Sequence, residues 1–528
     1  MSAQSISVQA AAPQPDAASL TEWFAVVAGA IGALMATLDI SITNTALPQI
    51  QGAIGASGTE GTWIGTGYLV AEVIMIPLTA WFTRLLGLRT LLLVTTTAFV
   101  LFSMFCGLSD SLLAMIIGRV GQGFFGGALI PTAQVIVRTR LPPRQMPVGM
   151  SIFGVIVLIG PILGPVLGGY LAEEITWRWC FFLNLPVGIA LAVLLLVGLP
   201  RQSPNLGLLA KADWWGIAGM TLAFSCLTVV FEEGQREAWF QSPMIVQLSL
   251  ASLLGFVVLF VTQKTSADPV IKLSLLRNGA FASATLIALA VGAATYGATF
   301  ILPQFLSTIA GYNPRQAGGI MALSAVPVLL LVPVLPRVVG RFDARIMVAL
   351  GLVFFAASCF VDIGLSPDSA GGDFTISQLL RGVGQILAAM PLNQVSMAAI
   401  GRENAADGAG IYSMARNLGG SMGLALSGVV IDQRSAAHSD TIREALTANS
   451  IAGQARLAVS GVSQGIDAAT AKLRAISQLS SLIERNALVM TYSDCFWLMG
   501  IMIIAMTPVV LLLRQPKKTA AAGLVAGH

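Results

Sequence analysis

Residues 154–169 read Gly-Val-Ile-Val-Leu-Ile-Gly-Pro-Ile-Leu-Gly-Pro-Val-Leu-Gly-Gly, an apolar stretch without a charged side chain. Three of its glycines are four residues apart, so a helix of this sequence carries a bare ridge along which another helix can pack closely. The prolines beside them cannot donate backbone hydrogen bonds and bend the helix. The residues of this pattern are Gly160, Pro161, Gly164, Pro165, Gly168 and Gly169. The stretch is either a generic packing face or a hinge-like interface between two halves of a protein.

The composition of the whole chain places this helix in a lipid bilayer, within a polytopic membrane protein. Of the 528 residues, 55% are hydrophobic and only 10% are charged, whereas about 25% of an ordinary soluble domain is charged. So few charged side chains cannot cover a soluble globule of this length, which excludes a soluble enzyme, a disordered chain and a nucleic-acid-binding protein. The two histidines and five scattered cysteines form no Cys-x-x-Cys pair and indicate neither a metal site nor a catalytic triad.

Apolar segments long enough to cross a bilayer follow one another between residues 23 and 513, and we count fourteen of them. With the N-terminus inside, the expected inner loops hold seventeen lysines and arginines. The short outer loops hold three, which are Arg178, Arg236 and Arg315. Because positive charge favours the cytoplasmic side, this bias predicts that both ends of the chain are cytoplasmic.

The stretch 432–488 is the one long polar segment between expected spans, and the count places it outside. Apolar residues recur at helical spacing from Ile466 to Ile483, through Leu473, Ile476 and Leu479. This spacing predicts one or two amphipathic helices that run on towards the last span. The stretch is either a surface linker or a docking surface for another protein.

Three ionisable residues lie deep in the first four expected spans, where burying a charge is costly. Asp39 lies in the first span, Glu72 in the second and Arg119 in the fourth; Tyr68 is one turn before Glu72, and Gln122 is three residues after Arg119. We expect a polar cluster at the bundle axis in which a carboxyl group exchanges a proton. The alternatives are a polar residue near a helix end for Asp39, a water-filled cavity without coupling for Glu72 and a packing ion pair for Arg119.

A weak internal repeat relates two distant parts of the chain. An intramembrane arginine, a Gly-Gln pair and a later proline occur from Arg119 to Pro131 and again from Arg381 to Pro391. Transporters built from repeated halves show this kind of echo.

Several of these strings resemble one known family. The stretch 154–169 is similar to the antiporter motif of the major facilitator superfamily, and 118–123 resembles its arginine motif in the fourth span. Residues 38–48, with Leu-Asp-x-x-Ile-x-Asn-x-Ala-Leu-Pro, resemble the first-span signature of the fourteen-span drug:proton antiporters of the EmrB/QacA type. The string from Tyr412 to Gly423 resembles their thirteenth-span signature. Segments 434–438 and 485–497 resemble the ends of the long outer loop of EmrB-like members.

The loop between the second and third spans departs from the superfamily pattern. Arg84, Gly87 and Arg89 fit it, but Ala80 and Thr83 stand where a glycine and an aspartate are usual. An acid from another loop, for instance Asp343, is a candidate to replace the missing aspartate in the charged contact on the inner side of the membrane.

The resemblance implies an all-α membrane protein with the major facilitator fold, two six-helix bundles plus two extra transmembrane helices. The division that we expect is a disordered cytoplasmic tail over 1–22, an N-terminal bundle over 23–200, two extra helices with their linkers over 201–278, a C-terminal bundle over 279–513 that includes the outer loop 432–488, and a cytoplasmic tail over 514–528.

The resemblance further implies export of hydrophobic or amphipathic drugs across the inner membrane, driven by the proton gradient without a cofactor. Asp39, Glu72 and Arg119 would couple protons. Candidates for substrate binding are Tyr68, Gln122, Tyr296, Phe300, Gln304, Tyr412 and Asn417, although ordinary packing also explains them. A periplasmic membrane-fusion adaptor and an outer-membrane channel are the implied partners.

Two other functions remain as alternatives. The same fold could export one endogenous metabolite, such as a siderophore, a fatty acid or an amino acid. A membrane-embedded enzyme or a channel is disfavoured, because the sequence carries neither clustered ligands for catalysis nor a repeated pore-lining segment.

Overall fold

The computed structural model describes residues 17–142, 144–266, 268–331, 334–335, 338, 342–445 and 468–513. These residues form helices and turns, without a strand among them. The expected tails therefore lie largely outside the described part of the chain: residues 1–16 and 514–528 are not described, and α1 already begins at Leu20.

The first half of the molecule is built from α1 to α9. Its elements are α1 (Leu20–Ile54), α2 (Gly58–Gly61), α3 (Trp63–Leu86), α4 (Leu88–Gly107), α5 (Leu112–Gly126), α6 (Leu129–Arg140), α7 (Met146–Tyr170), η1 (Leu171–Ile175), α8 (Trp179–Phe182) and α9 (Asn184–Gly198). Helix α1 begins at a capping box, in which Ser19 and Glu22 satisfy each other's free backbone N–H groups. It ends at Gly55, whose φ of 70° suits a residue without a Cβ atom. Helix α1 packs against α7, α9 and α6, and α3 packs against α5.

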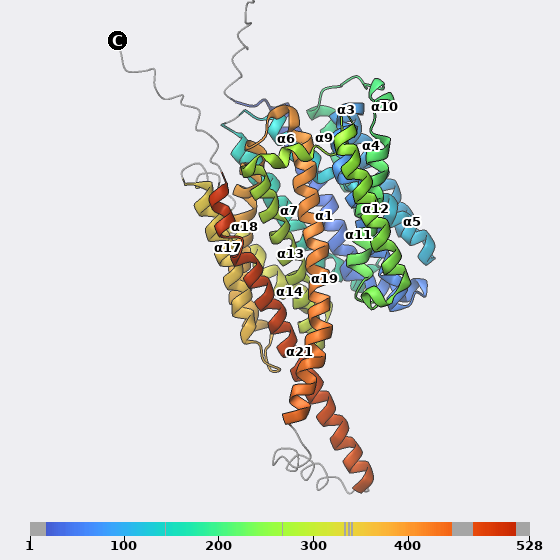
Figure 1. Cartoon of the computed structure of the whole chain (residues 1–528), viewed down its shortest axis with the longest axis vertical. Helices are drawn as coiled ribbons and strands as arrows, with labels where there is room; N and C mark the ends of the chain where they lie inside the picture. The colour runs from blue at the N-terminus through green and yellow to red at the C-terminus, as the bar shows by residue number, and fades with distance from the viewer. Residues whose placement is uncertain are drawn as a thin grey trace, which may run out of the picture.

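A pair of extra helices follows, which we call the extra hairpin. Its elements are α10 (Gly207–Ala210), α11 (Trp214–Glu233), η2 (Trp239–Gln241) and α12 (Pro243–Thr265). Helices α11 and α12 pack along each other, and α11 also contacts α3 and α19. Figure 1 shows the hairpin beside the N-terminal helices.

The second half follows η3 (Leu273–Arg277). Its elements are α13 (Gly279–Thr308), α14 (Pro314–Met321), η4 (Ala322–Ser324), α15 (Ala325–Leu331), α17 (Ala344–Val361), η5 (Asp362–Gly364), η6 (Gly371–Phe374), α18 (Thr375–Ala398), η7 (Arg402–Asn404), α19 (Ala405–Ala445), α21 (Ala468–Ile504) and η8 (Pro508–Leu512). Helix α17 packs on α18, α13 packs on α19, and α21 contacts α13, α17 and α19.

Ten helices in the described residues are long and apolar enough to cross a membrane, so the protein is a multi-pass membrane protein. Counting the bent pair 148–161 and 163–175 as one span brings the number to eleven; this pair turns by 41° beside Pro161 of α7. The remaining expected spans correspond to α18, to α19 and to a shorter apolar helix, Arg315–Leu331. The count of fourteen spans stays a prediction.

Helices α19 and α21 continue beyond the other helices at one end of the molecule (Figure 1). Helix α19 runs unbroken to Ala445, and α21 already begins at Ala468, so both ends of the polar stretch 432–488 are helical continuations of spans. Residue Ile466 of the expected apolar stripe lies outside the described residues. Further along the stripe, Ile476 is exposed and Ile483 is buried.

Candidate functional site

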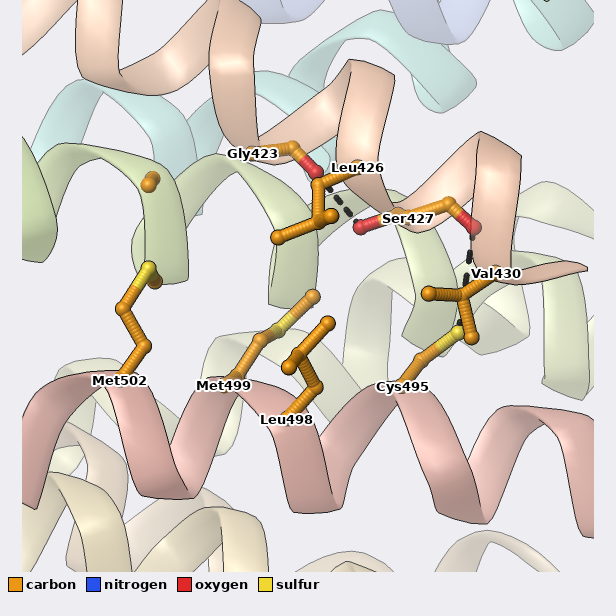
Figure 2. A pocket seen from close by; sticks show the side chains of 9 residues that line it. Gly423, Leu426, Ser427, Val430, Cys495, Leu498, Met499 and Met502 are labelled. Atoms are coloured by element: carbon orange, nitrogen blue, oxygen red, sulfur yellow. Dashed lines mark hydrogen bonds between the residues drawn. The ribbon is translucent and has the colours of Figure 1, made fainter.

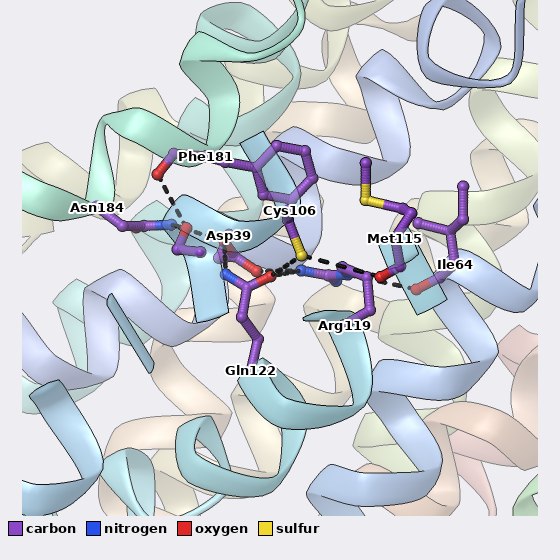
Figure 3. Close-up of polar contacts among 9 residues, drawn as sticks. Asp39, Ile64, Cys106, Met115, Arg119, Gln122, Phe181 and Asn184 are labelled. Atoms are coloured by element: carbon purple, nitrogen blue, oxygen red, sulfur yellow. Dashed lines mark hydrogen bonds and ion pairs between the residues drawn. The ribbon is translucent and has the colours of Figure 1, made fainter. Parts of the chain in front are cut away.

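A buried ion pair joins α1 to α5 in the first half. Arg119 Nη1 lies 2.5 Å from Asp39 Oδ2. The other carboxylate oxygen of Asp39 accepts hydrogen bonds from Gln122 Nε2 at 3.0 Å and Asn184 Nδ2 at 2.7 Å. Figure 3 shows the three partners converging on the carboxylate. Both charged side chains are 1% exposed or less, so each depends on the other for compensation.

The surroundings complete the cluster. The guanidinium of Arg119 donates from Nε to the backbone oxygen of Ile64 at 3.3 Å and lies 4.3 Å from the centre of the Tyr68 ring. Asn184 also donates to Ser103 Oγ at 2.9 Å. Sequence reasoning missed Asn184 and Ser103. The side-chain amide of Asn184, which lies within the apolar span expected over 179–199, was the signal that could have revealed it.

Glu72 occupies a different place, at the interface between the halves. Its side chain is 2% exposed and lies beside Asn417 of α19. A narrow cavity opens beside this contact. The residues that line it are Glu72, Ile76, Gly127, Ile130 and Gln134 from the first half and Tyr412, Ser413, Arg416 and Asn417 from the second. A carboxyl group and a guanidinium group from opposite halves therefore share one enclosed space.

The expected substrate-binding residues divide into three groups. Tyr412 and Asn417 line the cavity. Tyr68 and Gln122 belong to the Asp39 cluster, where Gln122 Oε1 also accepts from Arg119 at 3.0 Å. The third group is on α13: Tyr296 packs on Gly420, Phe300 is exposed, and neither these two nor Gln304 is among the described residues that line the cavity.

The glycine ridge of α7 packs against α1 of its own half. A Cβ atom on Gly160 would overlap Thr37, and one on Gly164 would overlap Ser41. Ser41 Oγ also donates to the backbone oxygen of Pro161 at 3.2 Å, an acceptor that the next proline leaves without its usual intrahelical partner.

Other positions of α7 approach the second half. Pro165 packs closely against Gly318, which leaves little room for a side chain on that side. Gly169 faces the backbone of Arg315. Helix α7 is thus packed between α1 and α14, with its close-approach glycines directed at α1.

Arg84, in the segment after the expected second span that lacks the usual aspartate, pairs with an acid from the second half. Arg84 Nη1 donates to both carboxylate oxygens of Asp407 on α19, at 3.0 and 3.1 Å. Lys272 Nζ donates to Asp407 Oδ2 at 3.0 Å. Asp343, the candidate named from the sequence, instead caps α17 by accepting from the backbone N–H of Arg345. The acid that pairs with Arg84 is therefore Asp407 rather than Asp343.

A second pocket lies within the second half, between α13, α19 and α21 (Figure 2). Met499, Met502 and Leu498 form one wall, and Ser427 Oγ donates to the backbone oxygen of Gly423 at 2.7 Å. No charged residue and none of the predicted site residues is among the described residues that line it. Across the described part of the chain, no group of three or more His, Cys, Asp or Glu side chains could hold a metal ion.

Comparison with known proteins agrees with this architecture. The model of the major facilitator superfamily matches residues 29–424. The chain is 29% identical to the colistin resistance protein EmrB of Acinetobacter baumannii, over 81% of this chain and 83% of the relative. It is also 29% identical to the multidrug export protein EmrB of Escherichia coli K12, over 89% and 91% of the two chains.

A solved structure shows the same fold at lower identity. The proton:xylose symporter XylE superposes with a TM-score of 0.59 at 12% identity, covering 93% of this chain and 95% of that one. At this identity the likeness concerns the arrangement of the helices alone.

Proposed function

The chain belongs to the major facilitator superfamily, and from this premise we propose that it exports hydrophobic or amphipathic drugs in exchange for protons. The observation that carries the proposal is the cavity between the halves, where Glu72 of α3 meets Asn417 and Arg416 of α19. Relatives named multidrug export protein and colistin resistance protein support the substrate class.

Glu72 connects proton exchange with the contact between the halves. A charged carboxylate accepts a stronger hydrogen bond than a neutral carboxylic acid. Protonation of Glu72 would therefore weaken its polar contact with Asn417 and favour separation of α3 from α19. Deprotonation would favour their contact, so one proton biases the rocking of one half against the other.

The Asp39 cluster would act as the second coupling element. Its carboxylate is balanced by Arg119 and held by two amides, so protonating it would release Arg119 from its only described carboxylate partner. Such a change would break the ion pair that links α1 to α5, and α1 also packs against the bent helix α7.

We place the transporter in the inner membrane with both ends cytoplasmic, on the charge bias of the loops. The two bundles, 23–200 and 279–513, would rock against each other, with 201–278 as an accessory segment. The projecting parts of α19 and α21 would receive a periplasmic adaptor that passes the drug to an outer-membrane channel.

Growth of an efflux-deficient host that expresses this chain, across a panel of toxic compounds, tests the proposal. We expect increased resistance to several amphipathic compounds, and each of these compounds should dissipate a pH gradient imposed on everted vesicles. Arg381→Lys, which retains the charge of a buried pair with Asp362 away from the cavity, serves as a folded control. Resistance to no compound, or resistance without proton movement, would contradict the proposal.

A further inference from the structure

The turn between α11 and α12 of the extra hairpin and the Arg84–Asp407 contact lie at opposite ends of the molecule. Helix α3 begins at Trp63 and carries Arg84 in its last turn. Helix α11 ends at Glu233, beside the first residues of α3. The hairpin thus reaches both halves at the end of the α3–α19 interface that the Arg84–Asp407 pair does not hold.

Glu233 attaches the hairpin to the first half. Its carboxylate accepts hydrogen bonds from Thr66 Oγ1 at 2.7 Å and from Thr62 Oγ1 at 3.3 Å. Arg236 lies 2.5 Å from the same carboxylate and also donates to Thr62. Glu233 is 2% exposed, so this group of bonds is sheltered from competing water.

The adjacent residues contact the second half. The carboxyl group of Glu232 lies beside the side chain of Ser421 of α19. The side-chain amide of Gln235 packs directly against Gly428 of α19. A side chain at position 428 would overlap it. Two consecutive glutamates therefore contact opposite halves of the transporter.

The two attachments differ in strength. Among the described contacts, those with α3 include an ion pair and several buried hydrogen bonds, whereas those with α19 include the approach of Glu232 to Ser421 and the close packing of Gln235 on Gly428. A conformational change that separates the halves at this end breaks the weaker contact first, because it costs less free energy.

We propose that the extra hairpin is a releasable clasp: Glu233 anchors it to the first half, and Glu232 and Gln235 hold the second half closed until it rocks away. This inference rests on the proposed rocking motion. It assigns Glu232 and Gln235 a role as positioning residues for the closed state of this end, rather than contact with the drug.

Distance measurement between spin labels tests the clasp without any substrate. In a variant without the five native cysteines, labels at the exposed positions Ala53 and Asp368 would report the separation of the two halves at this end. Glu232→Ala should raise the fraction of the longer distance by about two- to tenfold, the effect of losing one polar contact with α19. Glu237→Ala is the matched control, since the hydrogen bond of Glu237 to Ser242 stays within the hairpin.

Ser421→Ala removes the other partner of this polar contact and should produce the same increase. Distance distributions of both variants that superimpose on that of Glu237→Ala would overturn the clasp. Loss of resistance in the compound panel would instead bear on drug export, so failure of the clasp and failure of the proposed function are distinguishable.

Cross-linking provides an independent check. A short thiol cross-link between Gln235→Cys and Gly428→Cys should remove the longer distance, whereas a cross-link between Thr62→Cys and Glu233→Cys should leave it unchanged. Persistence of the longer distance in the first cross-linked protein would also overturn the proposal.

Discussion

Arg84 of α3 and Asp407 of α19 form a bidentate contact, at 3.0 and 3.1 Å, between residues 323 positions apart in the chain. The Asp407 side chain is 1% exposed, while Arg84 remains partly accessible at 29%. A buried carboxylate that holds cations from two other segments ties the halves together at this end.

Asp407→Asn should loosen this end of the interface, because Arg84 and Lys272 lose their shared negative partner. A cysteine placed at the cavity residue Ser413 should then react about tenfold faster with a thiol reagent supplied from this end, which corresponds to about 1.4 kcal/mol. Asp343→Asn is the control, since Asp343 only caps α17. Equal labelling rates in both variants would show that Asp407 does not close this end.

Asp39→Asn should abolish proton-driven efflux and also lower stability, because it leaves Arg119 as an unpaired buried charge. Removing one partner of a buried pair typically costs about 3–5 kcal/mol. The double variant Asp39→Asn/Arg119→Gln should recover thermal stability without recovering transport. Recovery of proton-coupled efflux in the double variant would make the pair structural.

Glu72→Gln should flatten the dependence of transport rate on pH, since the amide keeps a hydrogen-bonding side chain at the cavity but cannot exchange a proton. The measurement is efflux rate across a pH series, at a fixed membrane potential. Asn417→Ala removes the partner but leaves the carboxyl group, so it should retain a pH-dependent rate. A profile for Glu72→Gln that follows the unmodified protein would exclude Glu72 from coupling.

Gly164→Leu should block transport at normal expression, because the new side chain would overlap Ser41 and push α7 from α1. Gly169→Ala is the comparison, since its Cβ atom would lie 3.9 Å from the nearest atom. Resistance measured in the efflux-deficient host should survive only in the second variant. Full resistance with Gly164→Leu would mean that this close approach is dispensable.

Deletion of 440–480 should abolish drug resistance in cells yet spare drug binding to the purified protein, if the projecting helices receive an adaptor. The deletion leaves the contacts of Arg434 and His438 with Asp494 intact, at 2.7 and 2.8 Å. Surviving resistance, or loss of binding, would show that the segment serves the transporter itself.

The sequence predicted the helical fold and, by resemblance, the family, but it grouped Glu72 with Asp39 and Arg119, whereas the structure places Glu72 at the cavity between the halves. Asp39 and Arg119 were expected in one cluster, and the structure pairs them, since two opposite charges in the first and fourth expected spans compensate each other's burial. The role of these residues in coupling stays a prediction, as does the fourteen-span count.

Composition by itself determined that this chain is a polytopic membrane protein, and its motifs resemble those of the major facilitator superfamily, because hydropathy and glycine spacing are properties of local sequence. Only the tertiary structure decided which residues meet: Asp407 rather than Asp343 with Arg84, Asn184 with Asp39, and Glu72 with Asn417. These contacts join segments far apart in the chain. They depend on how the helices are rotated and placed against one another, which periodicity within a single helix does not specify.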